Sequence, residues 1–177
     1  MKKFFILLWA IILLPTICFS ANRLNDTATL NDMRNNPLNY LAVGNISREI
    51  SLYINKNSIE VQEYSPPNYI IAFTEVAYIV PINAKSPQEI SAQSHLRRYK
   101  YNLDEQKMYR ELKDSDGNFI DWEEVIPVST GPNIPFTAKG EIAFCLAYNR
   151  SFYYEPVTIY LQFYLKNGRW LTFAGRN

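Results

Sequence analysis

A cluster of cationic and aromatic side chains is the feature of this sequence best suited to bind another molecule. It comprises five consecutive residues and one residue on the next predicted segment: Arg97, Arg98, Tyr99, Lys100, Tyr101 and Arg110. Arginine and tyrosine are favoured at interfaces because a guanidinium presents planar donors and a phenol presents rigid amphipathic area. We therefore predict that these residues form a binding face for an extracellular or envelope protein or for an anionic glycan. The alternative is an ordinary exposed strand whose arginine stems cover apolar neighbours.

Residues for nucleophilic catalysis are scarce. The triads that activate Ser or Cys need a nearby base, and the only imidazole in the chain is His95. His95 follows a predicted helix and begins a predicted strand, a position typical of a surface histidine. Asp121, Glu123 and Glu124 could supply paired carboxylates, so an envelope hydrolase that uses Asp and Glu side chains is an alternative function. We predict a protein without catalytic activity.

The sequence also argues against a bound metal or cofactor. One His and, in the predicted mature chain, one Cys are too few for the three or four ligands of a zinc site. Asp114, Asp116 and Asn118 have the spacing of a calcium loop, but Phe119 and Val125 occupy the positions where that loop needs Gly and Glu. These residues predict a tight turn instead. The six Gly of the chain are scattered and form no phosphate-binding loop, so we expect no cofactor.

The beginning of the chain is typical of a secretory signal peptide. Lys2 and Lys3 precede an apolar run over residues 4–14, which is short for a membrane span. A cleavage site is predicted at the end of residues 1–20, which are the predicted signal peptide. Lipid attachment at Cys18 and a retained anchor helix are the two alternatives. We expect an exported protein, periplasmic, secreted or on the cell surface, with no stable membrane span after cleavage.

Composition indicates a single globular domain in the remainder of the chain. Of the 177 residues, 47% are hydrophobic and 20% are charged, and the formal net charge is +1. This balance excludes a disordered polymer and disfavours binding to nucleic acid, which needs clustered cationic charge. The aromatic content of 15% favours a sheet. Residues 21–39 are rich in Asn and predict an irregular lead-in, so the domain spans residues 40–177.

Alternation of apolar residues and turn-forming dipeptides predict an antiparallel sheet. The predicted elements, in chain order, are a hairpin over 51–61, a break at Pro66 and Pro67, a central strand over 69–80, a strand over 95–103, a hairpin of 107–113 with 118–125, and a closing pair of 157–165 with 169–173. The last two pairs are joined by Asp-Gly and Asn-Gly steps, which tolerate the positive φ of a hairpin turn.

Two helices are predicted to accompany these strands. Residues 86–89 have the pattern of a capped N-terminus and predict a short helix to about residue 94. Apolar residues near helical spacing predict a main helix over 137–149, which Gly140 weakens by about 1 kcal/mol relative to Ala. On this helix Cys145 is predicted to be a buried thiol, with an intermolecular disulfide as the alternative. The expected fold class is α+β: a twisted antiparallel sheet of hairpins with one main helix packed on it and a short second helix.

Two stretches resemble the surface-adhesin E-like family of small exported bacterial proteins. Residues 51–59 (SLYINKNSI) are similar to the early signature of that family. Trp122, residues 126–129 (IPVS) and Cys145 are similar to its tryptophan, its proline-serine pair and its helical cysteine, so the resemblance covers about residues 48–148. It implies an antiparallel sheet with a packed helix and, for some members, binding to host matrix proteins. The chain departs from the family where an Asn replaces the acidic residue of the early signature and where a second mature Cys is missing.

These patterns together predict a non-catalytic binding domain that is secreted or held in the cell envelope. Adhesin-like protein binding is what the resemblance implies. A purely structural envelope component is a further alternative beside the hydrolase.

Overall fold

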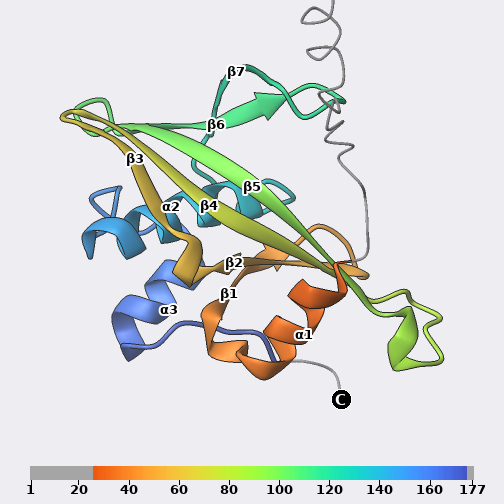
Figure 1. The fold of residues 1–177 in the computed structure, drawn as a ribbon. Helices are drawn as coiled ribbons and strands as arrows, with labels where there is room; N and C mark the ends of the chain where they lie inside the picture. The colour runs from red at the N-terminus through yellow and green to blue at the C-terminus, as the bar shows by residue number, and fades with distance from the viewer. Residues whose placement is uncertain (1–25, 175–177) are drawn as a thin grey trace, which may run out of the picture.

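A twisted, seven-stranded antiparallel sheet forms the centre of the molecule, and the computed structural model describes residues 26–174 (Figure 1). The strands are β1 (Tyr40–Asn45), β2 (Ile50–Asn55), β3 (Glu60–Ser65), β4 (Asn68–Ile79), β5 (Ser91–Asn102), β6 (Lys107–Lys113) and β7 (Phe119–Glu124). The helices are α1 (Thr27–Asn35), α2 (Ile134–Tyr148) and α3 (Ile159–Asn167), with single 3-10 turns η1 (Pro37–Asn39), η2 (Lys56–Ser58) and η3 (Pro87–Glu89). This arrangement confirms the predicted α+β class. The predicted signal peptide, residues 1–20, lies outside the described residues.

The long strands β4 and β5 are the axis of the sheet. They pair antiparallel along their whole length, from Asn68 opposite Asn102 to Ile79 opposite Ser91. The sheet order is β1-β2-β4-β5-β6-β7, with β3 beside β4. Because successive side chains of a strand point to opposite faces, each residue of β4 and β5 is assigned to one side of the sheet by its position alone. The central strand predicted over 69–80 is confirmed.

One face of the sheet, which we call the covered face, packs against α2. Its core is aromatic, and the hydroxyls of Tyr99 and Tyr101 donate hydrogen bonds to the carbonyl oxygens of Phe136 and Gly140 at 3.1 and 2.9 Å. A buried phenol usually finds such a partner, because an unpaired hydroxyl would lose its hydration without compensation. At Gly140 an added Cβ would overlap the sulfur of Met108, so this glycine allows the helix to approach the sheet closely. The predicted main helix is confirmed, with its start at Ile134.

A smaller core lies on the opposite face, under α1. Leu30 and Met33 of α1 pack with Val76 and Tyr78 of β4, and Phe173 joins them from the end of the chain. Helix α1 covers this face only where β5 begins. Farther along β5, and across β6 and β7, no described helix lies on this side of the sheet (Figure 1). We call the uncovered part over β5, β6 and β7 the open face.

The predicted irregular lead-in over 21–39 is wrong for most of its described part. Residues Thr27–Asn35 form α1, and the side chain of the capping residue Asp26 accepts a hydrogen bond from the Thr29 amide at 2.9 Å. An N-terminal Asp cap of this kind satisfies an amide that has no partner within the helix. The sequence prediction followed the high Asn content and overlooked Leu30 and Met33, the two apolar side chains of this helix that are buried against the sheet.

The predicted hairpin over 51–61 is also wrong in its pairing, although both of its strands exist. Strand β2 pairs with residues 75–79 of β4, and β3 pairs with residues 68–72 of the same strand. The two strands therefore lie end to end along one edge of β4. Between them the Ser58 hydroxyl accepts a hydrogen bond from the Thr74 amide at 2.7 Å, so a side chain fills the gap in the ladder. The predicted break at Pro66 and Pro67 is the turn between β3 and β4.

The two other deviations concern helix length and the end of the chain. The predicted helix over 86–94 is one 3-10 turn, because pairing with β4 makes the chain a strand from Ser91 onward. The predicted closing strands over 157–165 and 169–173 are wrong. Residues Ile159–Asn167 form α3, and Gly168, at φ +66, ends this helix rather than turning a hairpin. The hairpin of 107–113 with 118–125 is confirmed as β6 and β7.

Candidate functional site

The six residues of the predicted binding face lie on two different sides of the sheet. Tyr99 and Tyr101 are 2% and 0% exposed beneath α2, so the prediction is wrong for both tyrosines, which belong to the core. Arg97 shares their side of β5, and Arg110 is the cross-strand partner of Tyr99. Only Arg98 and Lys100 lie on the open face. Alternation along a strand separates neighbours in sequence, which is why a consecutive run cannot form one surface.

On the covered face, Glu75, Arg97 and Lys139 form an ion cluster that we call the covered triad. The Arg97 guanidinium lies 2.9 Å from Glu75 Oε1, and the Lys139 ammonium contacts the other carboxylate oxygen. The side chains of Glu75 and Lys139 are only 4% and 5% exposed. Burial opposes ionisation of Glu75, but Lys139 and Arg97 outweigh it and hold the pKa of this carboxyl below its ordinary value. Burial also lowers the pKa of Lys139, against the attraction of Glu75.

Aromatic contact completes the surroundings of the covered triad. The Lys139 ammonium lies 4.8 Å from the centre of the Phe136 ring, and the Arg110 guanidinium lies 4.0 Å from it. Such cation–π contacts compensate part of the lost hydration of a cation. Arg110 also pairs with Glu123 on β7. The triad therefore joins α2 to the sheet, and its charges are satisfied within the protein.

On the open face, Glu111, Arg98 and Lys113 form a second cluster, the open triad. Arg98 Nε donates to Glu111 Oε2 at 2.6 Å, and Lys113 Nζ lies 3.1 Å from the other oxygen. The Glu111 side chain is 3% exposed, whereas those of Arg98 and Lys113 are 33% and 27% exposed. Burial would raise the pKa of Glu111, but the hydrogen bonds from Arg98 and Lys113 hold it below its ordinary value. The same bond to Glu111 raises the pKa of Arg98.

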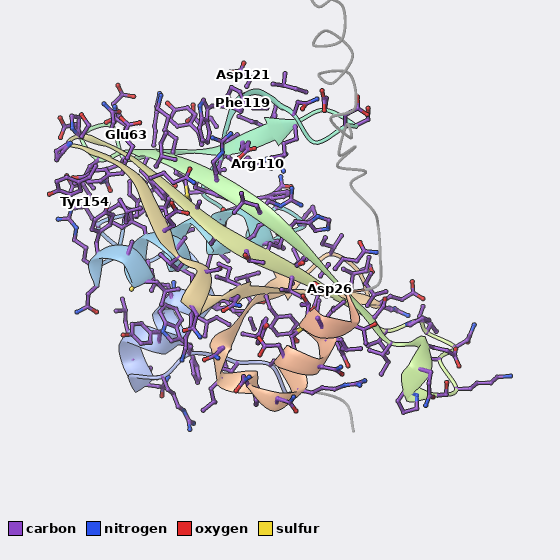
Figure 2. The ribbon with its side chains drawn as sticks, viewed as in Figure 1. Asp26, Glu63, Arg110, Phe119, Asp121 and Tyr154 are labelled. Atoms are coloured by element: carbon purple, nitrogen blue, oxygen red, sulfur yellow. The ribbon has the colours of Figure 1, made fainter. Side chains whose placement is uncertain are left out.

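Two aromatic rings lie near the Arg98 guanidinium. It lies 5.5 Å from the centre of the Phe119 ring and 5.9 Å from that of Trp122. Phe119 is 48% exposed, and Leu96 is 54% exposed beside the Lys113 side chain, which donates to the Leu96 carbonyl. In Figure 2, Arg110 is labelled below β6, on the side of α2. The open face thus combines an immobilised guanidinium with accessible aromatic and aliphatic area.

The sequence prediction missed Phe119 and Trp122 because a bulge lies between them. Lys113 pairs with Phe119 while Leu112 pairs with Asp121, which leaves Ile120 as an extra residue in β7. Strict alternation would place Phe119 and Trp122 on opposite sides, since they are three residues apart. The extra residue brings both rings to Arg98. In the sequence, this site is indicated only by the closeness of Phe119 and Trp122, with Ile120 between them.

His95 and the three candidate carboxylates lie on different strands, β5 and β7. His95 is exposed on β5, and partial burial and the nearby Arg97 lower its pKa. Asp121, Glu123 and Glu124 are exposed on β7. The predicted surface position of His95 is therefore confirmed.

Glu141 is a buried carboxyl that the sequence did not single out. Burial raises the pKa of this group. Its carboxylate accepts hydrogen bonds from the Val157 amide at 2.6 Å and from the amide and hydroxyl of Thr158 at 2.9 and 2.6 Å. These bonds hold the two residues that precede α3 against α2. Both carboxylate oxygens of Glu141 are therefore paired within the protein.

The predicted turn and the predicted thiol are both confirmed. The Asp114 carboxylate accepts hydrogen bonds from the amides of Asp116 and Asn118 at 2.9 and 2.8 Å, which lower its pKa. Cys145 is buried on α2, and burial raises the pKa of its thiol. Within residues 26–174 no group of three or more His, Cys, Asp or Glu side chains is arranged to hold a metal ion. Of the helices in this range, none has the length and apolar character needed to cross a membrane.

Comparison with known proteins gives no match for this chain. No family model, no curated protein and no solved structure is significantly similar to it.

Proposed function

We propose that this chain is an exported, non-catalytic binding domain that contacts a protein partner through its open face. The observation that supports the proposal is the Arg98 guanidinium, which Glu111 holds next to the exposed ring of Phe119 and the half-buried ring of Trp122. Arginine and aromatic side chains dominate the binding energy of protein interfaces when they are held in place before binding. Exposed Leu96 extends this surface with aliphatic area.

The charge balance of the open face favours a protein over an anionic glycan. Arg98 and Lys113 share the single carboxylate of Glu111, which neutralises one of their two charges and holds both cations within the chain. Lys100 is the cation of the predicted face that makes no ion pair with any of residues 26–174. One unpaired lysine is a weak attractor for a polyanion, whereas apolar area beside a fixed Arg suits a protein surface.

Export is the other half of the proposal and rests on the predicted signal peptide. The resemblance to the surface-adhesin E-like family supports the same location and an adhesin-like role. Cell fractionation followed by mass spectrometry of the mature N-terminus tests both cleavage and lipid attachment. An N-terminus at residue 21 in an exported fraction is the expected result. A chain that keeps residue 1 and stays in the cytosol would overturn this half.

Site-specific photo-crosslinking in intact cells tests the open face. A benzoyl-phenylalanine placed at position 119 is expected to form a discrete heavier adduct, because this ring is accessible beside Arg98. The matched control is position 159 on α3, where Ile159 is 60% exposed and far from the open face. Adducts at position 119 that are absent at position 159 support the proposal. No adduct at position 119, or the same adducts at both positions, removes the open face as a binding surface.

A charge introduced on the open face sharpens this test. Leu96→Asp is expected to abolish the adduct at position 119, since it replaces aliphatic contact area with a carboxylate that must lose its water when the partner binds. Leu38→Asp, at an exposed residue near α1, is the control and should leave the adduct unchanged. An adduct that consists of two copies of this chain would overturn the binding role in favour of the structural one.

A further inference from the structure

A cavity lies at the end of the molecule where β5 turns into β6. It has a volume of about 610 Å³ and is open to solvent on one side. The turn after β5 supplies Asp104 and Gln106, and the loop between α2 and α3 supplies Arg150, Ser151, Tyr153 and Tyr154. Cavities of this size with a few convergent polar groups are typical of sites for small ligands. None of these residues belongs to the open face or to the covered triad.

Three residues that line this cavity carry enclosed polar atoms with no hydrogen-bond partner in the described part of the chain. These atoms are Gln106 Oε1, Ser151 Oγ and Tyr153 Oη. The Gln106 amide is held by its nitrogen, which donates to the Leu103 carbonyl at 2.9 Å, so its oxygen is the end that remains unpaired. Burying a polar atom without a partner is unfavourable, and most such atoms in folded proteins are satisfied. These atoms have almost no accessible surface while the loop over residues 150–154 is in this position, so a molecule bound in the cavity would supply the missing partners once that loop moves and uncovers them.

The two segments that form the cavity are held in defined conformations. Gln106 and Asn149 both have φ of +53, a left-handed conformation that non-glycine residues rarely adopt. Asn149 ends α2, and its amide donates to the Cys145 carbonyl at 2.7 Å. The Leu103 amide donates to the Pro67 carbonyl at 2.9 Å, which ties the turn after β5 to the turn before β4. At Asn149 this conformation ends a helix and at Gln106 it closes the turn into β6, so both segments are fixed by the local fold.

The chemistry of the lining selects the class of ligand. Asp104 and Arg150 carry opposite charges, so the site has no net charge to attract an ion. The unpaired atoms are one amide oxygen and two hydroxyls, which together need partners that both donate and accept. Tyr154 is 93% exposed and offers a flat apolar ring at the edge of the cavity. Figure 2 shows it at the same end of the molecule as Glu63 of β3.

We propose that this cavity binds a neutral saccharide. A sugar ring presents hydroxyls that donate and accept hydrogen bonds, and an apolar ring face that can lie on an exposed aromatic side chain. Gln106, Ser151 and Tyr153 would receive the hydroxyls when the loop over residues 150–154 adjusts to the ligand, and Tyr154 would stack on the ring. This site is independent of the protein surface proposed above, because it shares no residue with it.

NMR titration of the folded mature chain tests the proposal directly. The probes are maltose, cellobiose and N,N′-diacetylchitobiose, each added to about 10 mM because single-sugar sites commonly have millimolar affinity. At least one probe is expected to shift the Gln106 side-chain amide signal and the backbone amides of residues 103–106 and 150–154. Tyr154→Ser should weaken binding by about fivefold, the loss expected for one aromatic contact. Leu38→Ser is the matched control, since Leu38 is exposed on η1, away from this cavity.

Each alternative outcome overturns the proposal. The absence of shifts with all three sugars would show that water alone satisfies the enclosed atoms. Shifts of similar size with glycerol would indicate a nonspecific effect of polyols. Stronger binding of galacturonate at the same residues would assign the site to an anionic ligand. Tyr154 is almost fully exposed, so its substitution is not expected to unfold the protein, and a failure of the Ser variant to weaken binding would also contradict the proposal.

Discussion

The two sides of β5 carry ion triads of the same composition in different surroundings. In each triad one nearly inaccessible carboxylate is shared by an arginine and a lysine. In the covered triad the lysine, Lys139, comes from α2 and is 5% exposed. In the open triad it is Lys113, from the same strand as Glu111, and it is 27% exposed. One triad thus connects a helix to the sheet, and the other holds Arg98 in place on an accessible surface.

The contribution of these three side-chain types to stability therefore depends on whether they are covered by the rest of the protein. A buried ion pair that loses one partner leaves an uncompensated charge in a medium that solvates it poorly. A cation at a partly exposed site can be hydrated by water instead, so the loss is small. We therefore expect changes in the covered triad to affect stability and changes in the open triad to affect binding.

Glu75→Gln should have the largest effect on stability. It leaves the ammonium of Lys139 buried without a carboxylate, and we expect a loss of about 3 kcal/mol in the free energy of unfolding. Urea denaturation of the wild type and the variant measures this loss. The double variant Glu75→Leu with Lys139→Met removes both charges and should recover most of it. A loss below about 1 kcal/mol in the single variant would contradict the role given to the covered triad.

Lowering the pH should reduce the stabilisation from the covered triad, as Glu75→Gln does. The pKa of Glu75 lies below its ordinary value of 4.5 in the folded protein, so the unfolded chain binds more protons between these two values. The stabilisation is therefore complete above about pH 4.5 and is lost as the pH falls through the folded value. The difference in stability between the wild type and Glu75→Gln should shrink below this pH. A difference that stays constant down to unfolding would contradict the assignment.

Gly140→Ala should show how tightly the covered face is packed. The new methyl group would overlap Met108 and the Tyr99 ring, and we expect a net loss of about 1–2 kcal/mol despite the better helix propensity of Ala. Combining it with Met108→Ala should cost less than the sum of the two single changes, because the smaller side chain makes room. On the open face, Leu96→Ala should change stability by less than about 0.5 kcal/mol. If the stability losses of the two single variants simply add up in the double variant, the expected overlap of the new methyl group with Met108 is wrong.

Glu111→Gln should have only a small effect on stability and still affect binding. Arg98 and Lys113 can be hydrated when they lose this carboxylate, so we expect a loss of less than about 1 kcal/mol. The Arg98 side chain would no longer be held near Phe119, and the photo-crosslink at position 119 should weaken. Arg97→Ala is the matched control on the other side of β5 and should leave the crosslink intact. If Arg97→Ala weakened the crosslink and Glu111→Gln did not, the covered face and not the open face would be the binding surface.

Local chemistry made several elements of the fold predictable. The Asp116-Gly117 step requires a residue that tolerates positive φ, and Gly117 has φ +88 in the turn between β6 and β7. The Pro66-Pro67 pair cannot continue a ladder, and β3 ends before it. Apolar residues at helical spacing marked α2. Each of these signals acts over a few residues and does not depend on the rest of the chain.

The end of the chain shows where local signals fail. Residues 157–165 alternate like a strand, yet α3 begins at Ile159, where the buried Glu141 carboxylate accepts hydrogen bonds from the preceding Val157 and Thr158. The Asn167-Gly168 step serves equally well as a hairpin turn and as a helix end. The helix was selected by a partner on α2, which lies 16 residues away from Val157.

The candidate site depended on tertiary structure even more strongly. The sequence by itself determined that Arg97 and Arg98 point to opposite sides of any strand, since this follows from backbone geometry. Only the folded sheet decided which side α2 would cover, and so which arginine would join a core and which a surface. Lys139 reaches Glu75 across 64 residues of sequence, and the extra residue Ile120 brings Phe119 to Arg98. Burial and pairing depend on contacts between segments that lie far apart in the sequence. The number of residues between two segments does not indicate how close they lie in the folded protein.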